Sequence, residues 1–296
     1  MKVGYRCALC LVARGYNQII RATEDRDTRL SALQQVIELI GRGFTPDAVP
    51  SILGTKRDRL VKEATGNSDP YANLKRGANG QALETFPFVR NWVVNHAEGL
   101  DRFHAACRAV SLANIIEYDI PGHDGSFVEH FASLEKEVFD IDDVASFYRL
   151  VRSGLRVLYL CDNAGEIAFD RLLVSEFRGL GCRVTVAVKG GAALNDALME
   201  DAVEVGMTGV ADEVVSTGTD AIGVNPEDCS EEFLRIFEGA ELILSKGMAN
   251  WETMTEFEAP CPTLFLLRTK CEPVAESLGV PLGRNVAKLV PKGFRL

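Results

Sequence analysis

Polar side chains of the kinds that bind metal ions follow two neighbouring apolar runs in the C-terminal half of the sequence. Asp162 and Asn163 come directly after the run that ends at Cys161, and Asn195 and Asp196 follow the next run by a few residues. Carboxylate and amide oxygens suit Mg²⁺, Mn²⁺ and similar divalent ions. The residue types therefore predict a divalent metal site at Asp162, Asn163 and Asp196.

Two lysines and two glycines after the same series of runs add the means to hold phosphate. Lys246 and Lys270 could neutralise phosphate oxygens, and Gly165 and Gly247 would let backbone N–H groups approach an anion. A helix predicted to start near Ile167 adds a favourable dipole. A metal ion and two ammonium groups around one phosphoryl group would stabilise the charge that develops during displacement. Phosphoryl chemistry is the function that this combination favours.

Each feature also has a purely structural interpretation. The stretch 162–165 is a good turn and helix cap, Asn195 and Asp196 could cap the next helix, and single lysines are commonly solvated. Glu166 and Glu252 would be favourable charges in a first helical turn. Only their joint position at strand ends favours a functional site.

The C-terminal half alternates short apolar runs with helical stretches from about Gly154 onward. The runs are Val157–Cys161, Val184–Val188, Val214–Ser216, Leu242–Ser245, Thr263–Leu267 and Val286–Val290. Nearly continuous apolar runs are typical of strands buried on both faces, and the alternation predicts a mostly parallel α/β sheet. Ligands bind beyond the carboxyl ends of such strands, where the polar loops converge.

The N-terminal half has the pattern of consecutive helices. Apolar residues recur at helical spacing from Leu30 to Ile40, and residues 105–116 have the same pattern. Prolines 46 and 70 each follow a capping residue and predict helix starts, and residues 122–125 predict a loop. The expected architecture is a helical N-terminal region, 1–150, packed on a doubly wound α/β/α, Rossmann-like domain, 151–296.

Composition limits the classes of partner. The net charge is −10 and there is no basic cluster, which argues against nucleic acid. No apolar run approaches the ~20 residues of a membrane span, and the N-terminus has no signal-peptide core. Eight cysteines without such a signal are typical of reduced thiols, so we expect a cytoplasmic protein. The sequence does not specify an oligomeric state.

The order of the motifs resembles that of the damage-control phosphatase family. The residues that carry the resemblance in the C-terminal half are Asp162-Asn163-Ala164-Gly165-Glu166, Asn195-Asp196, Lys246-Gly247-x-Ala249-Asn250-x-Glu252 and Leu266-Leu267-Arg268-Thr269-Lys270-Cys271. Those in the N-terminal half are Cys7-x-x-Cys10, Asp69-Pro70-Tyr71 with Lys75 and Asn79, and Ala113-Asn114-Ile115-Ile116-Glu117-Tyr118. The Cys-x-x-Cys places the chain nearest to the stand-alone prokaryotic branch.

The resemblance implies a metal-dependent phosphatase of small phosphomonoesters, such as sugar phosphates or damaged phosphorylated metabolites. It implies Mn²⁺, Ni²⁺, Co²⁺ or Mg²⁺ as the ion. Our mechanistic hypothesis is that water, or alternatively an Asp carboxylate, attacks in line, with Asp162 or Asp196 moving the proton. The implied roles are metal binding by Asp162, Asn163 and Asp196, catalysis by Asp162, Asp196 and Lys246, and substrate or phosphate binding by Glu166, Gly247, Asn250 and Lys270.

Two details depart from the eukaryotic branch of that family. There the acidic residue after the Asp-Asn-Ala-Gly stretch stands one position later than Glu166, and Arg268-Thr269-Lys270 lacks that branch's spacer. We align on the lysine, which leaves Arg268 and Thr269 without a role.

Other functions remain as alternatives. An S-adenosylmethionine-dependent carboxyl methyltransferase usually has a glycine-rich first loop and an acidic residue after its second strand, where this chain has only Gly165 and Lys189. A dehydrogenase would need Gly-x-Gly-x-x-Gly, and a haloacid-dehalogenase phosphatase would need Asp at position 164. A non-catalytic sugar-phosphate or metal-binding protein could use the same residues. Cys7 and Cys10 face the same way on a predicted helix, with buried thiols or a metal or redox role as the alternatives.

Overall fold

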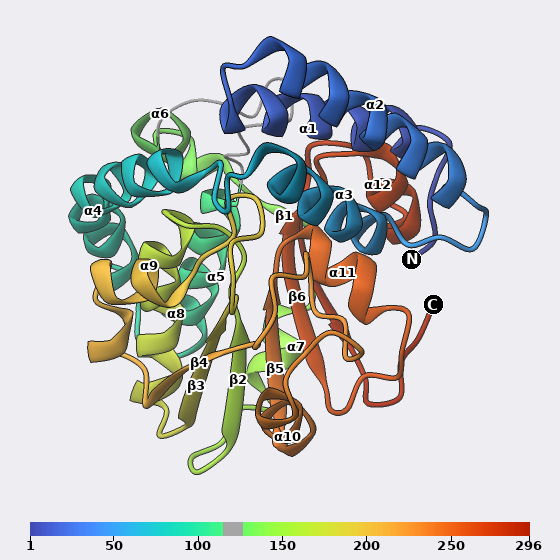
Figure 1. Cartoon of the computed structure of the whole chain (residues 1–296). Coiled ribbons are helices and arrows are strands. Elements are labelled where there is room, and N and C mark those ends of the chain that lie inside the picture. The colour runs from blue at the N-terminus through green and yellow to red at the C-terminus, as the bar shows by residue number, and fades with distance from the viewer. Residues whose placement is uncertain (115–126) are drawn as a thin grey trace.

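The computed structural model describes residues 1–114 and 127–296 (Figure 1). Its helices are α1 (Cys7–Ala22), α2 (Arg26–Gly43), α3 (Pro50–Thr65), α4 (Ala72–Val94), α5 (Leu100–Ala113), α6 (Phe127–Phe131), α7 (Val144–Tyr148), α8 (Glu166–Gly179), α9 (Met199–Glu204), α10 (Glu231–Gly239), α11 (Met248–Met254) and α12 (Glu272–Leu278). Its strands are β1 (Phe139–Asp142), β2 (Arg156–Leu160), β3 (Arg183–Val188), β4 (Glu213–Ser216), β5 (Leu242–Lys246), β6 (Thr263–Arg268) and β7 (Asn285–Val290).

The strands form one mixed sheet in the order β1-β7-β6-β5-β2-β3-β4. The five strands from β6 to β4 are parallel, whereas β7 runs antiparallel to β6 and parallel to β1. The chain leaves β2 toward β3 on one side and returns to β5 on the other. The carboxyl ends of β2 and β5 therefore flank the point where the strand order reverses, which is where open α/β sheets bind ligands.

Side chains alternate between two cores on the faces of the sheet. In β2, Val157 and Tyr159 pack into a core with α4, α5 and α8, whereas Leu158 and Leu160 pack into a core with α10, α11 and α12. This burial on both faces explains why the predicted strands are continuously apolar. The predicted α/β architecture, with helices on both sides of the sheet, is confirmed.

The N-terminal region is helical, as predicted, but it packs in two different ways. Helices α1, α2 and α3 share a small core of their own, built around Leu11, Val36 and Leu53. Figure 1 shows these three helices lying together across one end of the sheet. Helices α4 and α5 instead join the sheet's core, and β1 adds a strand from before residue 150. The sheet therefore recruits segments from both halves of the chain.

Several predicted helix starts differ from the structure. Helix α3 begins at Pro50 rather than at Pro46, because Ala48 N–H donates to the Thr45 carbonyl and closes a turn there. Helix α4 begins at Ala72, two residues after Pro70. Asn195 and Asp196 do not open a helix, because this stretch pairs with the loop after β2; α9 begins only at Met199. The loop predicted at 122–125 lies outside the described residues.

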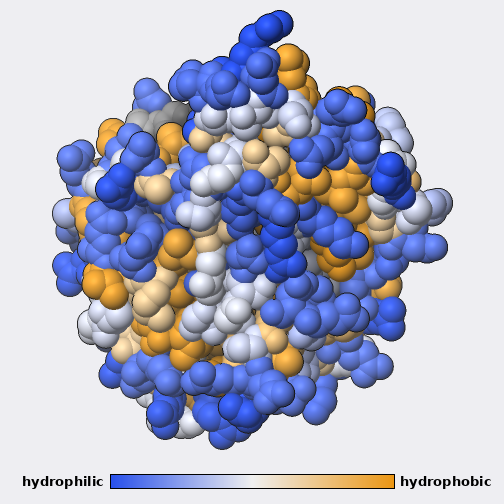
Figure 2. Space-filling view, viewed as in Figure 1, coloured by the Kyte–Doolittle hydropathy of each residue, from blue (hydrophilic) through white to orange (hydrophobic). Residues whose placement is uncertain are grey.

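The face of the molecule in Figure 2 is mostly hydrophilic, with hydrophobic residues in scattered patches. Within residues 1–114 and 127–296, no helix combines the length and the apolar character needed to cross a membrane. All eight cysteines are free thiols.

Candidate functional site

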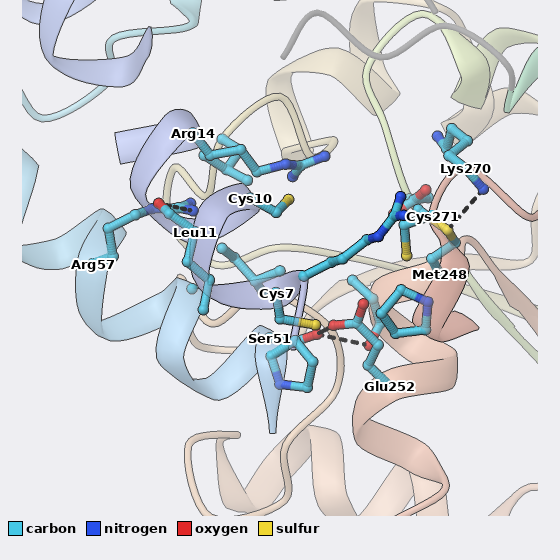
Figure 3. A pocket seen from close by; sticks show the side chains of 18 of the residues that line it. Cys7, Cys10, Leu11, Arg14, Ser51, Arg57, Met248, Glu252, Lys270 and Cys271 are labelled. Atoms are coloured by element: carbon cyan, nitrogen blue, oxygen red, sulfur yellow. Dashed lines mark hydrogen bonds between the residues drawn. The ribbon is translucent and has the colours of Figure 1, made fainter. Parts of the chain in front are cut away.

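A pocket of about 280 Å³ lies between α1, α3 and the carboxyl ends of the central strands. Its walls include Asp162 and Asn163 after β2, Asn195 and Asp196 after β3, and Lys270 after β6. The far wall comes from α1 and α3, as Figure 3 shows for several of their residues. The pocket thus gathers all three predicted metal ligands and one of the two predicted phosphate-binding lysines.

The loops after β2 and β3 are held together by backbone pairing. Asn163 and Asp196 form an isolated antiparallel bridge, and Ala197 N–H donates to the Asp162 carbonyl at 2.8 Å. Leu194, just before this pairing, adopts a φ of +49°, a region that residues with a Cβ seldom occupy. Strain of this kind persists only where surrounding contacts hold it in place. Backbone pairing, rather than sequence proximity, brings the predicted ligands together.

Two asparagine amides hold the carboxylates in the β2 loop. Asn114 Nδ2 donates to Asp162 Oδ2 and to Glu166 Oε2, both at 2.7 Å. Asn163 Nδ2 donates to the same two oxygens, at 3.0 and 3.2 Å. These bonds fix the position of one oxygen of each carboxylate. They also turn the amide nitrogen of Asn163 toward the protein, so its carbonyl oxygen is the atom available to a ligand.

The donor set at this wall fits a hard divalent cation. Asp162 and Asp196 offer carboxylate oxygens, and Asn163 offers an amide oxygen. In the part of the chain that the structure describes, no group of three or more His, Cys, Asp and Glu side chains is arranged to hold a metal ion. The set is therefore two carboxylates and one amide, all oxygen donors, which suits Mg²⁺ or Mn²⁺ and leaves coordination positions for substrate or water.

Lys246 lies deeper than the predicted contact with phosphate requires. It is fully buried and does not line the pocket. Its Nζ donates to Glu166 Oε1, to Asp170 Oδ1 at 3.0 Å and to the Val110 carbonyl at 3.0 Å, which uses all three of its N–H groups. Burial acts to lower the pKa of Lys246, but the carboxylates of Asp170 and Glu166 outweigh burial and raise the pKa. This geometry favours a role in holding Glu166 over direct contact with substrate.

The sequence predicted that the backbone N–H groups of Gly165 and Gly247 approach an anion, but in the structure both groups bind other parts of the protein. Gly165 N–H donates to Asn79 Oδ1 at 2.7 Å, and Gly247 N–H donates to the Leu266 carbonyl at 3.0 Å. Both donors are therefore used within the protein. What both positions do need is a positive φ, of 77° and 82°, which glycine adopts without strain.

The remaining predicted substrate contacts are divided between the pocket and the interior. Lys270 lines the pocket, and its Nζ donates to the Asn114 carbonyl at 2.8 Å. Asn250 is buried away from the pocket, and its Nδ2 donates to the Lys246 carbonyl at 2.8 Å. Glu166 is 1% exposed and is held by asparagine and lysine partners. Lys270 is therefore the predicted phosphate-binding side chain that the fold places at the pocket wall.

Two residues near the site received no role from the sequence. Asn114 bridges Asp162 and Glu166, although the sequence offered it only as part of a motif in the helical half. Lys189, at the end of β3, is 5% exposed and lies 3.6 Å from Asp196 Oδ2. The position of Lys189 at a strand's carboxyl end was a usable signal, because that edge is where the other polar residues gather.

Three thiols line the same pocket. Cys7 and Cys10 come from the first turns of α1, and Cys271 follows Lys270 at the start of α12 (Figure 3). Burial raises the pKa of Cys7 to about 11 and that of Cys271 to about 12, so both are neutral thiols at physiological pH. Cys10 is exposed. The Cys-x-x-Cys thus lies at the pocket rather than in a separate core.

Comparison with known proteins gives one consistent family. The model of the damage-control phosphatase ARMT1-like domain matches residues 3–286. The chain is 33% identical over 294 residues to a damage-control phosphatase from Archaeoglobus fulgidus, covering 98% of this chain and 100% of the relative. A damage-control phosphatase from Pyrococcus horikoshii is 30% identical over 287 residues, 97% of each chain. The crystal structure of a DUF89 family protein from Pyrococcus horikoshii superposes with a TM-score of 0.85 at 29% identity, covering 99% of both chains.

Proposed function

Because the chain belongs to the damage-control phosphatase family, we propose that it is a metal-dependent phosphatase of small phosphomonoesters. Family membership supports the phosphatase activity. The metal dependence and the substrate class are our own inference from the site. The observation that carries them is that Asp162, Asn163, Asp196 and Lys270 line one pocket at the point where the strand order reverses.

In the proposed site, a divalent ion at Asp162, Asn163 and Asp196 would polarise a phosphoryl oxygen and offset its charge. The protein's own residues do the rest. Lys270 binds another phosphoryl oxygen with its ammonium group. Asn114 orients the Asp162 carboxylate by donating a hydrogen bond to one of its oxygens. The attacking water gives its proton to one of the two carboxylates, Asp162 or Asp196, as its oxygen bonds to phosphorus. The ester P–O bond breaks, and the leaving alcohol takes up that proton.

The size and position of the pocket support a small metabolite as the substrate. A volume of about 280 Å³ corresponds to the lower end of ordinary ligand sites. Sugar phosphates and damaged phosphorylated metabolites fall in this size class. The chain's net charge of −10 does not oppose a small anion, because the local field of the lysine and metal decides binding.

The test is phosphate release by metal-stripped protein to which Mg²⁺, Mn²⁺, Co²⁺ or Ni²⁺ is returned in turn, with a panel of phosphorylated metabolites. We expect release only with added metal, and a loss of at least about 100-fold in Asp162→Ala. The matched control is Asp47→Ala, at an exposed aspartate in the α2–α3 connection, which should behave as wild type. No release with any metal from folded protein, or full release by Asp162→Ala, would contradict the proposal.

A further inference from the structure

Arg57 of α3 is a buried cation with unused hydrogen-bonding capacity in the pocket wall. The residue is 1% exposed and lines the pocket. Its Nη1 donates to the Leu11 carbonyl at 3.5 Å, a long bond. Its Nε and Nη2 are buried and have no acceptor among residues 1–114 and 127–296. A buried donor without a partner is costly, and more so for a charged group, so such groups call for an explanation.

Among residues 1–114 and 127–296, no carboxylate forms an ion pair with this guanidinium. The carboxylate of the adjacent Asp58 interacts with other residues. Its Oδ2 lies 2.8 Å from Lys62 Nζ, and its Oδ1 accepts a hydrogen bond from Gln18 Nε2 at 2.8 Å. Gly15 of α1 gives the side chain room, since a Cβ there would lie 3.2 Å from Arg57 Cδ. The fold therefore places a positive charge in the pocket wall, and the part of the chain that the structure describes offers it no ion pair.

A second arginine strengthens the positive field at this end of the pocket. Arg14 of α1 also lines the pocket, and Figure 3 shows its side chain extending toward the side where Lys270 lies. Burial lowers the pKa of Arg57, and the charge of Arg14 lowers it further. Two like charges in a low-dielectric wall repel each other, and an anion between them would relieve that repulsion.

The acidic residues at this end of the pocket have partners of their own. Glu252 of α11 interacts with the charge of Arg14 and accepts a hydrogen bond from Ser51 Oγ. Burial raises the pKa of Glu252. Glu272 at the rim is already paired with Arg6 at 2.7 Å.

Lys270, the predicted phosphate-binding side chain at the pocket wall, lies across the same pocket from Arg57. Lys270 and Arg57 appear on opposite sides of the pocket in Figure 3. A small molecule with its phosphoryl group at Lys270 and the metal ligands would direct its other end at α1 and α3. Guanidinium groups bind carboxylates and phosphates through paired N–H donors.

We propose that Arg57 and Arg14 bind a second oxyanion of the substrate, so that the preferred substrates are phosphomonoesters that also carry a carboxylate or a second phosphoryl group. This inference rests on the proposed phosphatase function and specifies its substrate class. Uncharged sugar phosphates are then poorer substrates than phosphorylated acids or bisphosphates of similar size.

The test compares matched pairs of substrates. The first pair is 3-phosphoglycerate and glycerol 3-phosphate, in which a carboxylate replaces a hydroxymethyl group. The second is fructose 1,6-bisphosphate and fructose 1-phosphate. We expect kcat/KM to be at least about tenfold higher for the member of each pair that carries a second anionic group, chiefly because its KM is lower. The pair that shows the larger ratio distinguishes a carboxylate from a second phosphate. A ratio near one in both pairs would overturn the proposal.

Substitutions of Arg14 and Arg57 test whether these residues cause the kcat/KM ratio within each substrate pair. In Arg14→Met and Arg57→Met the ratio should fall toward one. Arg57→Lys keeps the charge but removes the paired donors, so it should retain part of the ratio. Because Arg57→Met removes a buried side chain and could unfold, Arg14→Met provides the independent measurement. Arg42→Met is the control, since the Arg42 side chain is 85% exposed on α2, and its ratio should equal that of wild type. A ratio that stays at the full wild-type value in both Arg14→Met and Arg57→Lys would also overturn the proposal.

Failure of the phosphatase function is distinguishable from failure of this inference. If neither member of a pair releases phosphate, the proposed function fails, and calorimetric binding of 3-phosphoglycerate and glycerol 3-phosphate decides the inference. Tighter binding of 3-phosphoglycerate that is lost in Arg14→Met would support it. Equal affinities would contradict it.

Discussion

Gly247 lies directly against the carboxylate of Asp162. A Cβ built on Gly247 would overlap the carboxyl group, with Asp162 Oδ1 at 2.6 Å and the other carboxyl atoms closer still. Gly247 also has a φ of +82°. The loop after β5 therefore closes on the predicted metal ligand after β2, and the absence of a side chain at position 247 is what allows the two loops to meet.

Gly247→Ala should abolish most of the activity. The added methyl group would displace the Asp162 carboxylate, and a shift of about 1 Å can cost on the order of 100-fold in rate. Phosphate release with saturating metal is the measurement. Gly239→Ala is the control, because a Cβ at this exposed glycine of α10 meets nothing within 4 Å. A Gly247→Ala protein with normal kcat would show that Asp162 does not act from its present position.

Lys246→Met should mainly destabilise the fold. The substitution leaves Glu166 and Asp170 buried without their cation, and breaking a buried ion pair in this way costs about 3–5 kcal/mol. Denaturant unfolding measures the change, with Lys292→Met as the exposed-lysine control. If the variant is as stable as wild type but inactive, the result would instead support the direct contact with phosphate that the sequence predicted for Lys246.

Asn114→Ala should weaken the metal site from a distance. It removes the donor that bridges Asp162 Oδ2 and Glu166 Oε2 and leaves the two carboxylates to repel each other. Loss of a residue that orients metal ligands typically costs about 10–100-fold in metal affinity or activity. We expect a higher metal concentration at half-maximal activity, measured by titrating metal into stripped protein. Asn73→Ala, at an exposed position in α4, should leave this value unchanged.

The pocket thiols should differ in their rates of alkylation. The thiolate is the reactive form, so Cys7, with its pKa raised to about 11, is about 0.1% thiolate at pH 8 and gains about tenfold per pH unit up to pH 11. Cys271, at about 12, should react more slowly still. Exposed Cys10 should be modified first. Peptide mapping after timed treatment with iodoacetamide gives the order, and rapid modification of Cys7 at pH 7 would contradict its burial.

The pattern of apolar residues alone predicted the strands that carry the candidate site. All six predicted apolar runs coincide with strands β2 to β7. The pattern is strongest in the central strands β2, β5 and β6, because a strand buried on both faces is apolar at nearly every position. The same pattern placed the loops of Asp162, Asp196 and Lys270 at one edge, since parallel strands share their carboxyl ends. The strand β1 had no such signal, because its alternate residues Asp140 and Asp142 are exposed.

The sequence by itself therefore determined the strands, the family motifs and the edge where the polar side chains gather. The tertiary structure decided which of these side chains reach the pocket. Lys246 and Lys270 look alike in the sequence, yet Lys246 donates to a carbonyl 136 positions away and is enclosed, whereas Lys270 lines the pocket. The far wall with Arg57 also comes from helices more than 100 residues before the metal ligands. The burial of a side chain and its hydrogen-bond partners depend on which distant segments of the chain pack together. The local spacing of residues in the sequence does not determine those contacts.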